Sequence, residues 1–350
     1  MALILGPLTN IHIYILTYMD ESGGVFRDSY NFFGVKRKRD NIMLSKIQKD
    51  LFDNATSPVI KYRLALLLNE DISQECFDNF YTSKWVQMLK DNQNVDGGYG
   101  RFHSQNSKIK QKYGTTEKAI ESMNILGLRR GNELVDKLCL YMEKILNNEI
   151  AWPDGYEKNK WYRAAQPIFI ISKLSNFTSE DKAYLKNCEK WLEILNEAFK
   201  GKEYDSYSTN TISEKLVGCQ IHGSYIGLNS VYLIELFANL SRQIDKGVQE
   251  KYLNWLYSDD VTIHYAGVKL REFSNIDINV LYRLLFHISK FECFDDIFAA
   301  GIKQLASKYC MDGLWNFGNA FSVQKLSDTW RNEKIKICDH SVLAWVAKLS

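Results

Sequence analysis

Apolar residues recur along most of the chain at the three- and four-residue spacing of helices that bury one face. One set of predicted helices carries its aromatic or aliphatic residues in a single narrow stripe, and we call these the narrow-seam helices. They lie at 76–90, 134–146, 184–199, 248–257 and 294–309. A second set is apolar or small on most faces, as expected of helices covered on both sides, at 58–68, 115–126, 162–174, 224–240, 276–291 and 339–349. A weaker helical segment at 42–52 precedes both sets. The alternation predicts an all-α protein.

Acidic residues beside glycine or an aromatic follow the narrow-seam helices. The clearest are Asp96, Asp154 and Asp312, with Asp205 and Asp259 between them at similar spacing. One repeat therefore spans roughly fifty residues, enough for two helices and their connections. Since such repeats bury their faces only by stacking, we expect about six helical hairpins closed into a double-layered α/α toroid. Its inner helices would all run the same way, so that their positively polarised N-termini surround one mouth of a central cavity.

Composition agrees with a large folded core. The chain has 350 residues with 45% hydrophobic, 13% aromatic and 25% charged side chains. It contains only 4 prolines, the residue type that most strongly interrupts helices. These values exclude collagen-like, low-complexity and mainly disordered proteins. The net charge of +2 provides no global field for nucleic acid or an anionic membrane surface, so neither is expected as a partner. We expect one toroid domain over residues 1–350, with no assigned role for residues 1–40.

The seven cysteines are an odd number, lie far apart and form no CxxC pair. A disulfide framework is therefore not expected, and a reducing cytoplasm is the simpler location. Residues 1–19 are apolar but lack a basic segment and an A-x-A cleavage site, so they do not match a signal peptide. No other segment holds 18 uninterrupted apolar residues, and we expect a soluble protein without a membrane span.

The repeat before Asp96 carries a more specific pattern. The spacing of Gln93, Gly97 and Tyr99 within 85–99 resembles the aromatic-glutamine repeat of squalene and terpenoid cyclases, with Tyr99 in place of the usual tryptophan. Residues 115–128 resemble the inner helix of the same superfamily, which includes the protein prenyltransferase β subunits. In physical terms, Gln93 would cross-link helix ends, Gly97 would permit a tight loop, and Tyr99 would pack beneath the next helix.

This resemblance implies an α/α toroid whose aromatic-lined cavity suits a small apolar or prenyl-diphosphate ligand. Fold alone does not imply catalysis, because function resides in sites built on the fold.

Acid-initiated terpenoid cyclisation uses a DxDD motif, in which neighbouring carboxylates keep one carboxyl protonated. Asp259 and Asp260 are the nearest match and occupy the correct point of a repeat, but Tyr257 stands where the first aspartate belongs. The alternative is that Ser258 or Asp259 caps a helix. The magnesium-binding DDxxD motif of diphosphate ionisation is absent, since Asp295 and Asp296 are not followed by a third aspartate at the required position.

Two zinc sites are conceivable from the residue types. Asp312 and His340 resemble two of the three zinc ligands of protein prenyltransferases, with Leu314 in place of the cysteine, so that Cys310 or Cys338 would have to substitute. Lanthionine cyclases share the toroid and bind zinc through two cysteines and a histidine. Cys219 and His222 resemble one half of such a site, again needing Cys310 or Cys338. The alternative is that these residues serve packing only.

Aromatic and basic residues at the starts of the inner helices are candidate ligand contacts. Their rings could line a hydrocarbon cavity and stabilise a carbocation, or could fill a core. The arginines could bind a phosphate or form surface ion pairs. The candidates are Trp161, Tyr162, Arg163, His222, Tyr225, Tyr265, Trp315, Trp330 and Arg331.

The leading hypothesis is a terpenoid cyclase- or prenyltransferase-like toroid that binds an apolar isoprenoid-like ligand. If it is an enzyme, acid-initiated cyclisation or prenyl transfer would depend on Asp259 and Asp260 or on Asp312 and His340. Two alternatives are a noncatalytic repeat-based binding scaffold and a zinc-dependent, lanthionine cyclase-like enzyme that modifies peptides. Zinc or magnesium would be the cofactor of the enzymatic forms.

Overall fold

The structure is a computed structural model that describes residues 44–103, 114–155 and 160–349. The chain divides into two units, Met1–Lys46 and Ile47–Ser350, and the description below concerns the second. The predicted N-terminal segment 1–40 lies outside the described residues. Helices dominate the described part, which confirms the all-α prediction. None of its helices combines the length and hydrophobicity needed to cross a membrane.

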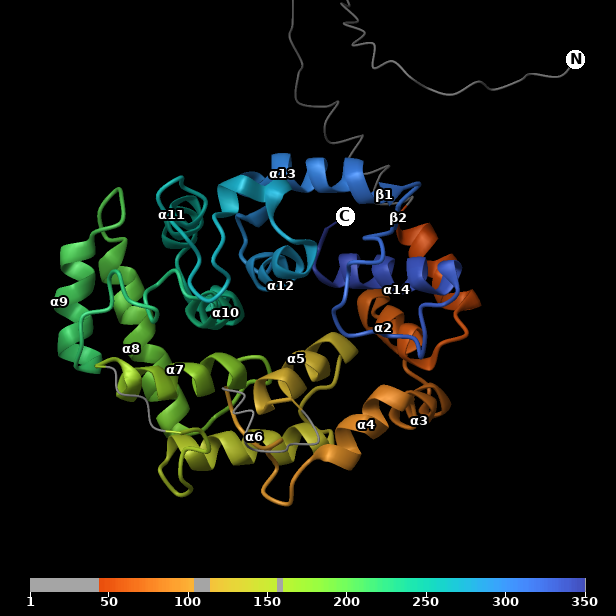
Figure 1. Cartoon of the computed structure of the whole chain (residues 1–350), viewed down its shortest axis with the longest axis horizontal. Helices are drawn as coiled ribbons and strands as arrows, with labels where there is room; N and C mark the ends of the chain where they lie inside the picture. The colour runs from red at the N-terminus through yellow and green to blue at the C-terminus, as the bar shows by residue number, and fades with distance from the viewer. Residues whose placement is uncertain (1–43, 104–113, 156–159, 350) are drawn as a thin grey trace, which may run out of the picture. The chain divides into compact units, whose positions relative to one another are not determined.

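Helices of the two predicted kinds alternate along the second unit. Those lying toward its middle in Figure 1 are α2 (Pro58–Leu68), α5 (Thr116–Leu126), α7 (Tyr162–Leu174), α10 (Val231–Asn239), α12 (Ile278–Ile288) and α14 (Glu333–Val346). Those lying outside them are α3 (Gln74–Tyr81), α4 (Lys84–Asn92), α6 (Glu133–Leu146), α8 (Lys182–Ala198), α11 (Lys246–Leu256) and α13 (Phe294–Tyr309). Among the inner helices, α10 packs against α7 and α12, and α14 packs against α2.

Local sequence fixes where most inner helices begin. Ser57, Thr115, Ser230, Asp277 and Asn332 precede five of them, and each side chain accepts a hydrogen bond from a backbone N–H of the first turn. A capping oxygen satisfies one of the amide groups that a helix start leaves without a partner. Pro58 adds a preset backbone angle at the first position of α2.

The predicted helix 76–90 is in fact two helices. Ser83 takes an extended backbone (φ −63°, ψ 152°) between α3 and α4, which ends the first and starts the second. The predicted helix 224–240 likewise begins only at Val231. Ile226 and Leu228 are buried by a loop of consecutive turns instead, so apolar spacing alone overstated the helix.

The last predicted helix also begins elsewhere. α14 starts at Glu333, capped by Asn332, so Asp339 and His340 lie in its middle and not at its start as the sequence pattern suggested. Earlier in the chain, a tight turn joins the two short antiparallel strands β1 (Cys310–Met311) and β2 (Leu314–Trp315). Short 3-10 helices, η1 (Ser241–Gln243) and η2 (Leu270–Asn275), complete the described elements.

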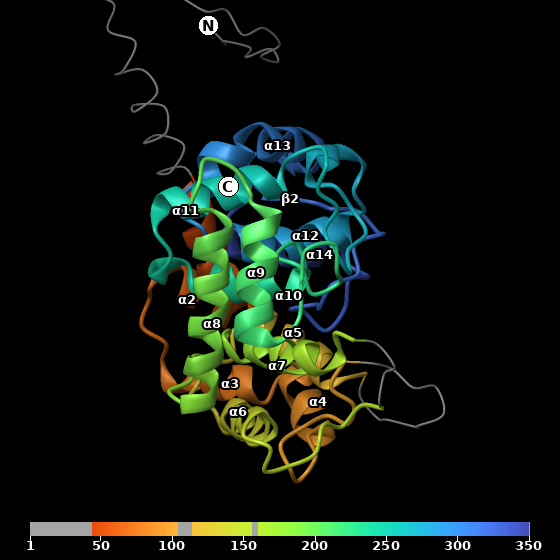
Figure 2. The ribbon, with the colours of Figure 1, turned by 90° about the vertical axis from the view of Figure 1, so that its left-hand side faces the viewer.

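One described helix, α9 (Ser206–Val217), was not predicted. Asp205, expected to be a loop residue between an outer and an inner helix, caps α9 by accepting from the N–H groups of Tyr207 and Ser208. α9 packs beside α8 (Figure 2) and buries only Thr209 and Ser213. Its fully buried positions hold small hydroxyl residues, so apolar spacing alone does not mark this face of α9.

The loop around Gln93 has the structure that its sequence predicts. The Gln93 side-chain amide donates to the carbonyls of Gly97 and Leu134, both at 2.9 Å, and so ties the end of α4 to the start of α6. Gly97 has φ +95°, and a Cβ there would lie 2.3 Å from the carbonyl oxygen of Lys137. Tyr99 is 2% exposed, and its backbone N–H donates to the Thr116 hydroxyl in the first turn of α5. The predictions for Gln93 and Gly97 are therefore confirmed.

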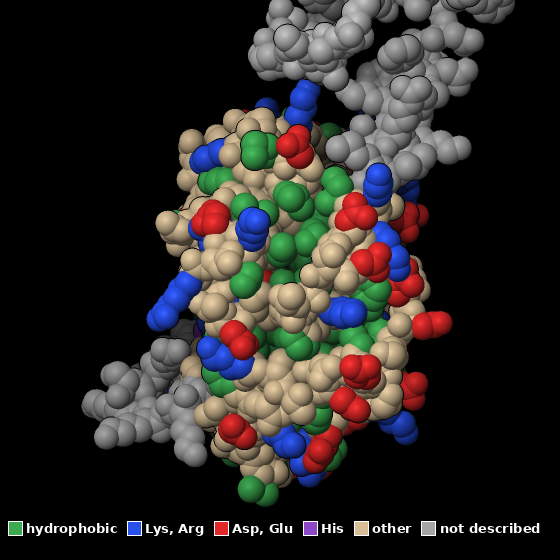
Figure 3. All heavy atoms as spheres, turned by 90° about the vertical axis from the view of Figure 1, so that its right-hand side faces the viewer, with side chains coloured by type: hydrophobic (Ala, Val, Ile, Leu, Met, Phe, Trp, Pro, Cys, Tyr) green, Lys and Arg blue, Asp and Glu red, His purple; other side chains and the backbone are tan. Residues whose placement is uncertain are grey.

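The hydrophobic core lies between the outer and inner helices. Tyr252 of α11 illustrates this, because its fully buried ring meets Phe237 of α10 and Phe291 after α12, while its hydroxyl donates to the carbonyl of Leu228. On the face seen in Figure 3, hydrophobic side chains gather in the middle and charged side chains lie mostly around them.

Candidate functional site

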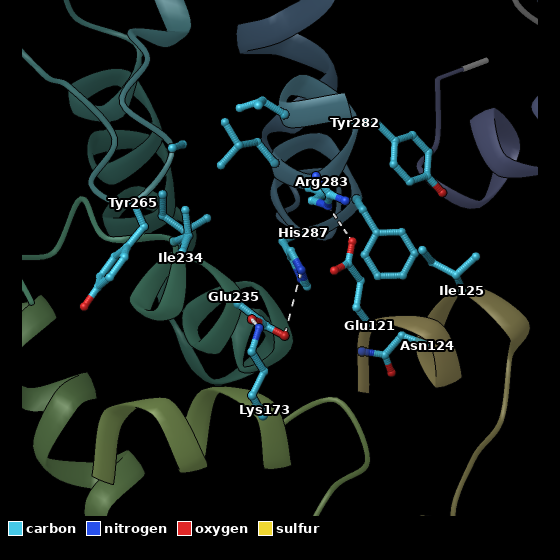
Figure 4. Close-up of a pocket in the computed structure, with 15 residues that line it drawn as sticks. Glu121, Asn124, Ile125, Lys173, Ile234, Glu235, Tyr265, Tyr282, Arg283 and His287 are labelled. Atoms are coloured by element: carbon cyan, nitrogen blue, oxygen red, sulfur yellow. Dashed lines mark hydrogen bonds and ion pairs between the residues drawn. The ribbon is translucent and has the colours of Figure 1, made fainter. Parts of the chain in front are cut away.

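A pocket lies between the four inner helices α5, α7, α10 and α12. It encloses about 240 Å³. Its apolar wall comes mainly from α10 and α12, whose sequences are rich in apolar residues. Figure 4 shows charged side chains from α5, α7, α10 and α12 reaching into the same space. The apolar lining consists of Ile125, Val231, Ile234, Ala266, Val280, Leu284 and Phe286.

A buried ionic cluster forms one end of the pocket. Glu235 of α10 is 3% exposed and accepts hydrogen bonds from Lys173, Ser172 and Asn176 of the α7 segment. The Nε2 atom of His287, on α12, lies 3.9 Å from the same carboxylate. The cluster therefore joins three inner helices through one carboxylate.

The charges of this cluster follow from burial and pairing. Burial disfavours ionisation of Glu235, but the attraction of Lys173 and His287 outweighs it and lowers the pKa of the carboxyl to about 2. Burial also opposes the charge of Lys173, yet Glu235 raises its pKa above the ordinary value. Burial lowers the pKa of His287 to about 3, so its ring is neutral at neutral pH. The cluster is thus a carboxylate–ammonium pair beside a neutral imidazole.

Polar contacts continue from the cluster toward the ends of the helices. Asn176 and Ser175 bind the side-chain amide of Asn239, whose oxygen accepts from Lys290 at 2.6 Å. Burial lowers the pKa of Lys290 to about 8. A continuous network of hydrogen bonds therefore holds α7, α10 and the end of α12 in register.

A second ion pair crosses the pocket from α5 to α12. Glu121 accepts from Arg283 and from Lys118. Burial raises the pKa of Glu121, but the two cations outweigh it and leave the pKa below the ordinary value. Both residues of the Glu121–Arg283 pair also line an adjoining, more open hollow with Trp85, Lys118 and Lys325.

Aromatic residues gather at another edge of the pocket. Tyr265 lines the pocket, is 46% exposed and has φ +68°, a left-handed backbone that is rare for a bulky side chain. Its ring meets the edges of His103, Tyr232 and Phe169. His103 Nδ1 lies 2.9 Å from Glu117 and 2.7 Å from the Tyr232 hydroxyl. Strained backbone of this kind concentrates at functional sites.

Only Tyr265 among the predicted ligand contacts lines this pocket. Tyr225 lies beside this edge of the pocket, where its ring makes edge-to-face contacts with Tyr265 and Trp161. Tyr162 donates to the carbonyl of Gly155, and Arg163 is exposed. Tyr162 and Arg163 start α7 as predicted, whereas Tyr225 lies in the loop before α10 and not at the helix start.

The remaining predicted contacts lie apart from the pocket lining. His222 is exposed, with Nδ1 3.0 Å from the Tyr204 hydroxyl. Trp315 is 2% exposed, and its backbone N–H donates to the Ser341 hydroxyl. Trp330 donates to Asp339, while Arg331 is exposed beside the cap of α14.

The proposed acids Asp259 and Asp260 are exposed and do not line the pocket. The Asp259 side chain is 81% exposed, and its carboxylate lies 3.8 Å from Arg271. Such a surface pair contributes little to stability. Neither carboxyl lies in a buried environment.

Asp312 and His340 occupy different environments. Asp312 is exposed in the β1–β2 turn with φ +51°, whereas His340 is fully buried and accepts from the N–H of Phe317. Trp330 packs edge-on against the His340 ring, with centroids 4.7 Å apart. The carboxylate of the neighbouring residue Asp339 accepts hydrogen bonds from two backbone N–H groups. It also accepts from the Ser327 hydroxyl and from the indole N–H of Trp330. This arrangement fastens the loop before α14 to the helix.

The candidate metal ligands do not form a cluster. Cys219, Cys310 and Cys338 are part-buried thiols. Within the ranges that the structure describes, no three His, Cys, Asp or Glu side chains converge so that they could hold a metal ion.

Sequence analysis missed the charged residues of the pocket. Lys173 and Glu235 each interrupt an otherwise apolar inner helix, and Glu121, Arg283 and His287 occupy comparable positions. A charged residue within a helix expected to be covered on both sides is the signal that could have found them, because isolated buried charges require partners.

Comparison with protein-family models, curated proteins and solved structures finds no match to this chain.

Proposed function

We propose that residues 47–350 form an α/α toroid whose central pocket binds a small, mainly apolar, isoprenoid-like molecule. The alternation of inner and outer helices supports the toroid (Figure 1). So do the contacts of α10 with α7 and α12, and of α14 with α2. The Glu121–Arg283 pair links α5 to α12, and the Tyr62 hydroxyl donates to Gly127 at the end of α5.

The pocket itself carries the binding proposal. It combines an apolar wall with charges that are paired with each other, as in the Glu235–Lys173 and Glu121–Arg283 pairs. Concave, mostly apolar sites with a few fixed polar groups are typical of small-molecule binding. An apolar ligand would bury its surface against Ile234, Val280 and Leu284 without separating a buried ion pair.

Binding is better supported than acid-initiated cyclisation. Glu235 and Glu121 are the carboxyl groups of the pocket lining, and both have pKa values below the ordinary value. Protonation of an alkene needs a carboxylic acid that stays protonated. Cyclisation, prenyl transfer and zinc-dependent peptide modification stay predictions of the sequence.

Calorimetric titration with farnesol, a neutral isoprenoid alcohol, tests the binding proposal. We expect saturable binding to the wild-type protein and none to Ile234→Trp, whose larger side chain fills the pocket. Leu140→Trp is the control, because Leu140 lies on outer helix α6 and is 50% exposed. Thermal unfolding of each variant verifies that it is folded. Absence of farnesol binding to the wild type, or equal binding to Ile234→Trp, would contradict the proposal.

Incubation with prenyl diphosphates of several lengths, followed by mass spectrometry, tests the enzymatic forms separately. Formation of a cyclised or prenylated product would show that the site does more than bind. Ligand binding without product would leave the binding proposal as the function.

A further inference from the structure

Arg63 is a buried cation without a partner in the described residues. It lies in the middle of inner helix α2 and is 7% exposed. No hydrogen bond or ion pair to its guanidinium occurs in the described ranges, and its buried Nε atom has no acceptor. Burial lowers the pKa of Arg63 to about 10, so the side chain is charged at neutral pH. Buried charges are normally paired, because leaving water is costly.

The titratable groups around Arg63 are two tyrosines and another arginine. Its charge interacts favourably with the hydroxyl groups of Tyr282 and Tyr62 and unfavourably with Arg129. No carboxylate contributes appreciably to its environment in the described residues. Tyr282 is 1% exposed, and its hydroxyl is likewise buried without a hydrogen-bond partner. Two independent polar groups therefore lack partners at one place.

This place adjoins the central pocket. Tyr282 lines the pocket, and Figure 4 shows it on the same side as Ile125, away from Lys173 and Glu235. The Arg63 guanidinium lies close to Gly127, which follows Ile125 by two residues. A Cβ on Gly127 would lie 2.4 Å from the Nη1 atom of Arg63. The cation therefore lies at the end of α5, two residues along the chain from Ile125 of the pocket lining.

The end of α5 offers only partial compensation. Gly127 caps α5 at its C-terminus, where the helix dipole presents the equivalent of about half a negative charge. The carbonyls of Met123 and Asn124 there already accept from the N–H of Gly127, and the Gly127 carbonyl accepts from Tyr62. Part of the positive charge of Arg63 therefore stays uncompensated.

We infer that Arg63 and Tyr282 form an anion subsite at this end of the pocket, and that the ligand carries a carboxylate or a phosphate. A guanidinium binds either group through paired N–H donors, and a tyrosine hydroxyl donates a further hydrogen bond. The inference rests on the proposed function, because the apolar body of the ligand occupies the central pocket. The ligand class is thus an anionic amphiphile.

Three ligands that share one carbon chain test the subsite: farnesol, farnesoic acid and farnesyl phosphate. We expect at least one anionic ligand to bind the wild-type protein about tenfold more tightly than farnesol, or better. Arg63→Gln should remove that advantage and leave the affinity for farnesol within about twofold. Comparison of the carboxylate with the phosphate identifies which anion the site prefers. Arg242→Gln, an exposed arginine of η1, is the control for loss of one positive charge.

Tyr282→Phe provides a second variant, since it removes only a hydroxyl group. We expect it to weaken the anionic ligand by a smaller factor than Arg63→Gln and to leave farnesol binding unchanged. Arg63→Gln should also unfold at no lower temperature than the wild type without ligand, because no native partner is lost.

The outcomes separate this inference from the proposed function. Farnesol binding without any advantage for an anionic ligand would overturn the anion subsite and leave the proposed function intact. An advantage that persists in Arg63→Gln would also overturn it, since another cation would then be responsible. If no farnesyl compound binds but inorganic phosphate binds in an Arg63-dependent way, the subsite stands and the proposed function fails.

Discussion

Two buried cations of the inner helices, Lys173 and Arg63, are treated in opposite ways. Lys173 is paired with Glu235, which also accepts from Ser172 and Asn176. Arg63 is more enclosed than Lys173 but faces two tyrosine hydroxyl groups and a second arginine. In the first arrangement, a carboxylate of the protein itself neutralises the charge of the buried cation. The second leaves a charge for something else to neutralise, which is why we assign the pair to the structure and Arg63 to the ligand.

Glu235→Gln should produce the largest effect on stability. It removes the charge that compensates Lys173 and leaves a buried ammonium unpaired, so we expect a loss of about 3–5 kcal/mol. Urea denaturation measures the free energy of unfolding. The double variant Glu235→Gln with Lys173→Met is the control, and it should recover much of the loss because neither charge then remains. A loss below about 1 kcal/mol would mean that the pair does not hold the inner helices together.

Acidification should weaken the paired cluster in a defined pH window. The pKa of Glu235 is about 2 in the folded protein against 4.5 ordinarily, a contribution of about 3 kcal/mol. That stability is fully present above pH 4.5 and is lost as the pH falls toward 2. His287 also lowers the stability as the pH falls. Its pKa is 6.5 ordinarily and about 3 in the folded protein, so between these two pH values only the unfolded chain binds the proton.

Denaturation curves at pH values from 7 to 2.5 check this window. Glu235→Gln should flatten the lower part of the dependence, whereas Arg63→Gln should leave the whole profile parallel to that of the wild type. A profile that is equally steep in Glu235→Gln would assign the acid sensitivity to other carboxyl groups.

Arg63→Met should behave unlike the loss of Glu235. Because Arg63 has no anionic partner in the described residues, replacing it removes a desolvation cost and little attraction. We expect the free energy of unfolding without ligand to stay within about 1 kcal/mol of the wild type or to rise. Urea denaturation decides this, and a loss above about 2 kcal/mol would show that Arg63 has a structural role.

Gly127→Ala tests the geometry at Arg63. The backbone there has φ +86°, and the new Cβ would lie 2.4 Å from Nη1 of Arg63. We expect a cost of about 1–2 kcal/mol from the left-handed backbone and the contact together. In an Arg63→Gln background, the part due to the contact should disappear. An equal cost in both backgrounds would mean that the guanidinium moves away freely.

Periodicity predicted most helices but not all their limits. The eleven predicted narrow-seam and covered segments are all occupied by helices, because burial of one or two faces imposes a spacing that apolar residues must follow. The pattern failed at residues 224–230, where Ile226 and Leu228 are buried by turns, and at α9, where Thr209 and Ser213 make the contact. Burial alone therefore does not distinguish a helix from a packed loop.

The candidate site was predictable only in small part. Tyr265 was identified because aromatics were expected at the starts of inner helices, and it does line the pocket. The motif-based candidates Asp259, Asp312 and His222 are exposed, and His340 is buried among rings. Motif spacing fixes which residues are neighbours along the chain, but it does not state whether a turn faces a cavity or solvent.

The sequence by itself determined the all-α class, the alternation of two kinds of helix, and local devices such as Gln93 and the caps at Ser57 and Thr115. These depend on contacts within a few residues or within one repeat. Only the tertiary structure decided which charges are paired. Glu235 meets Lys173 across 62 residues, and Arg283 meets Glu121 across 162. Arg63 was left without a counterpart by the same packing, because the free energy of a buried charge depends on neighbours that the linear sequence does not specify.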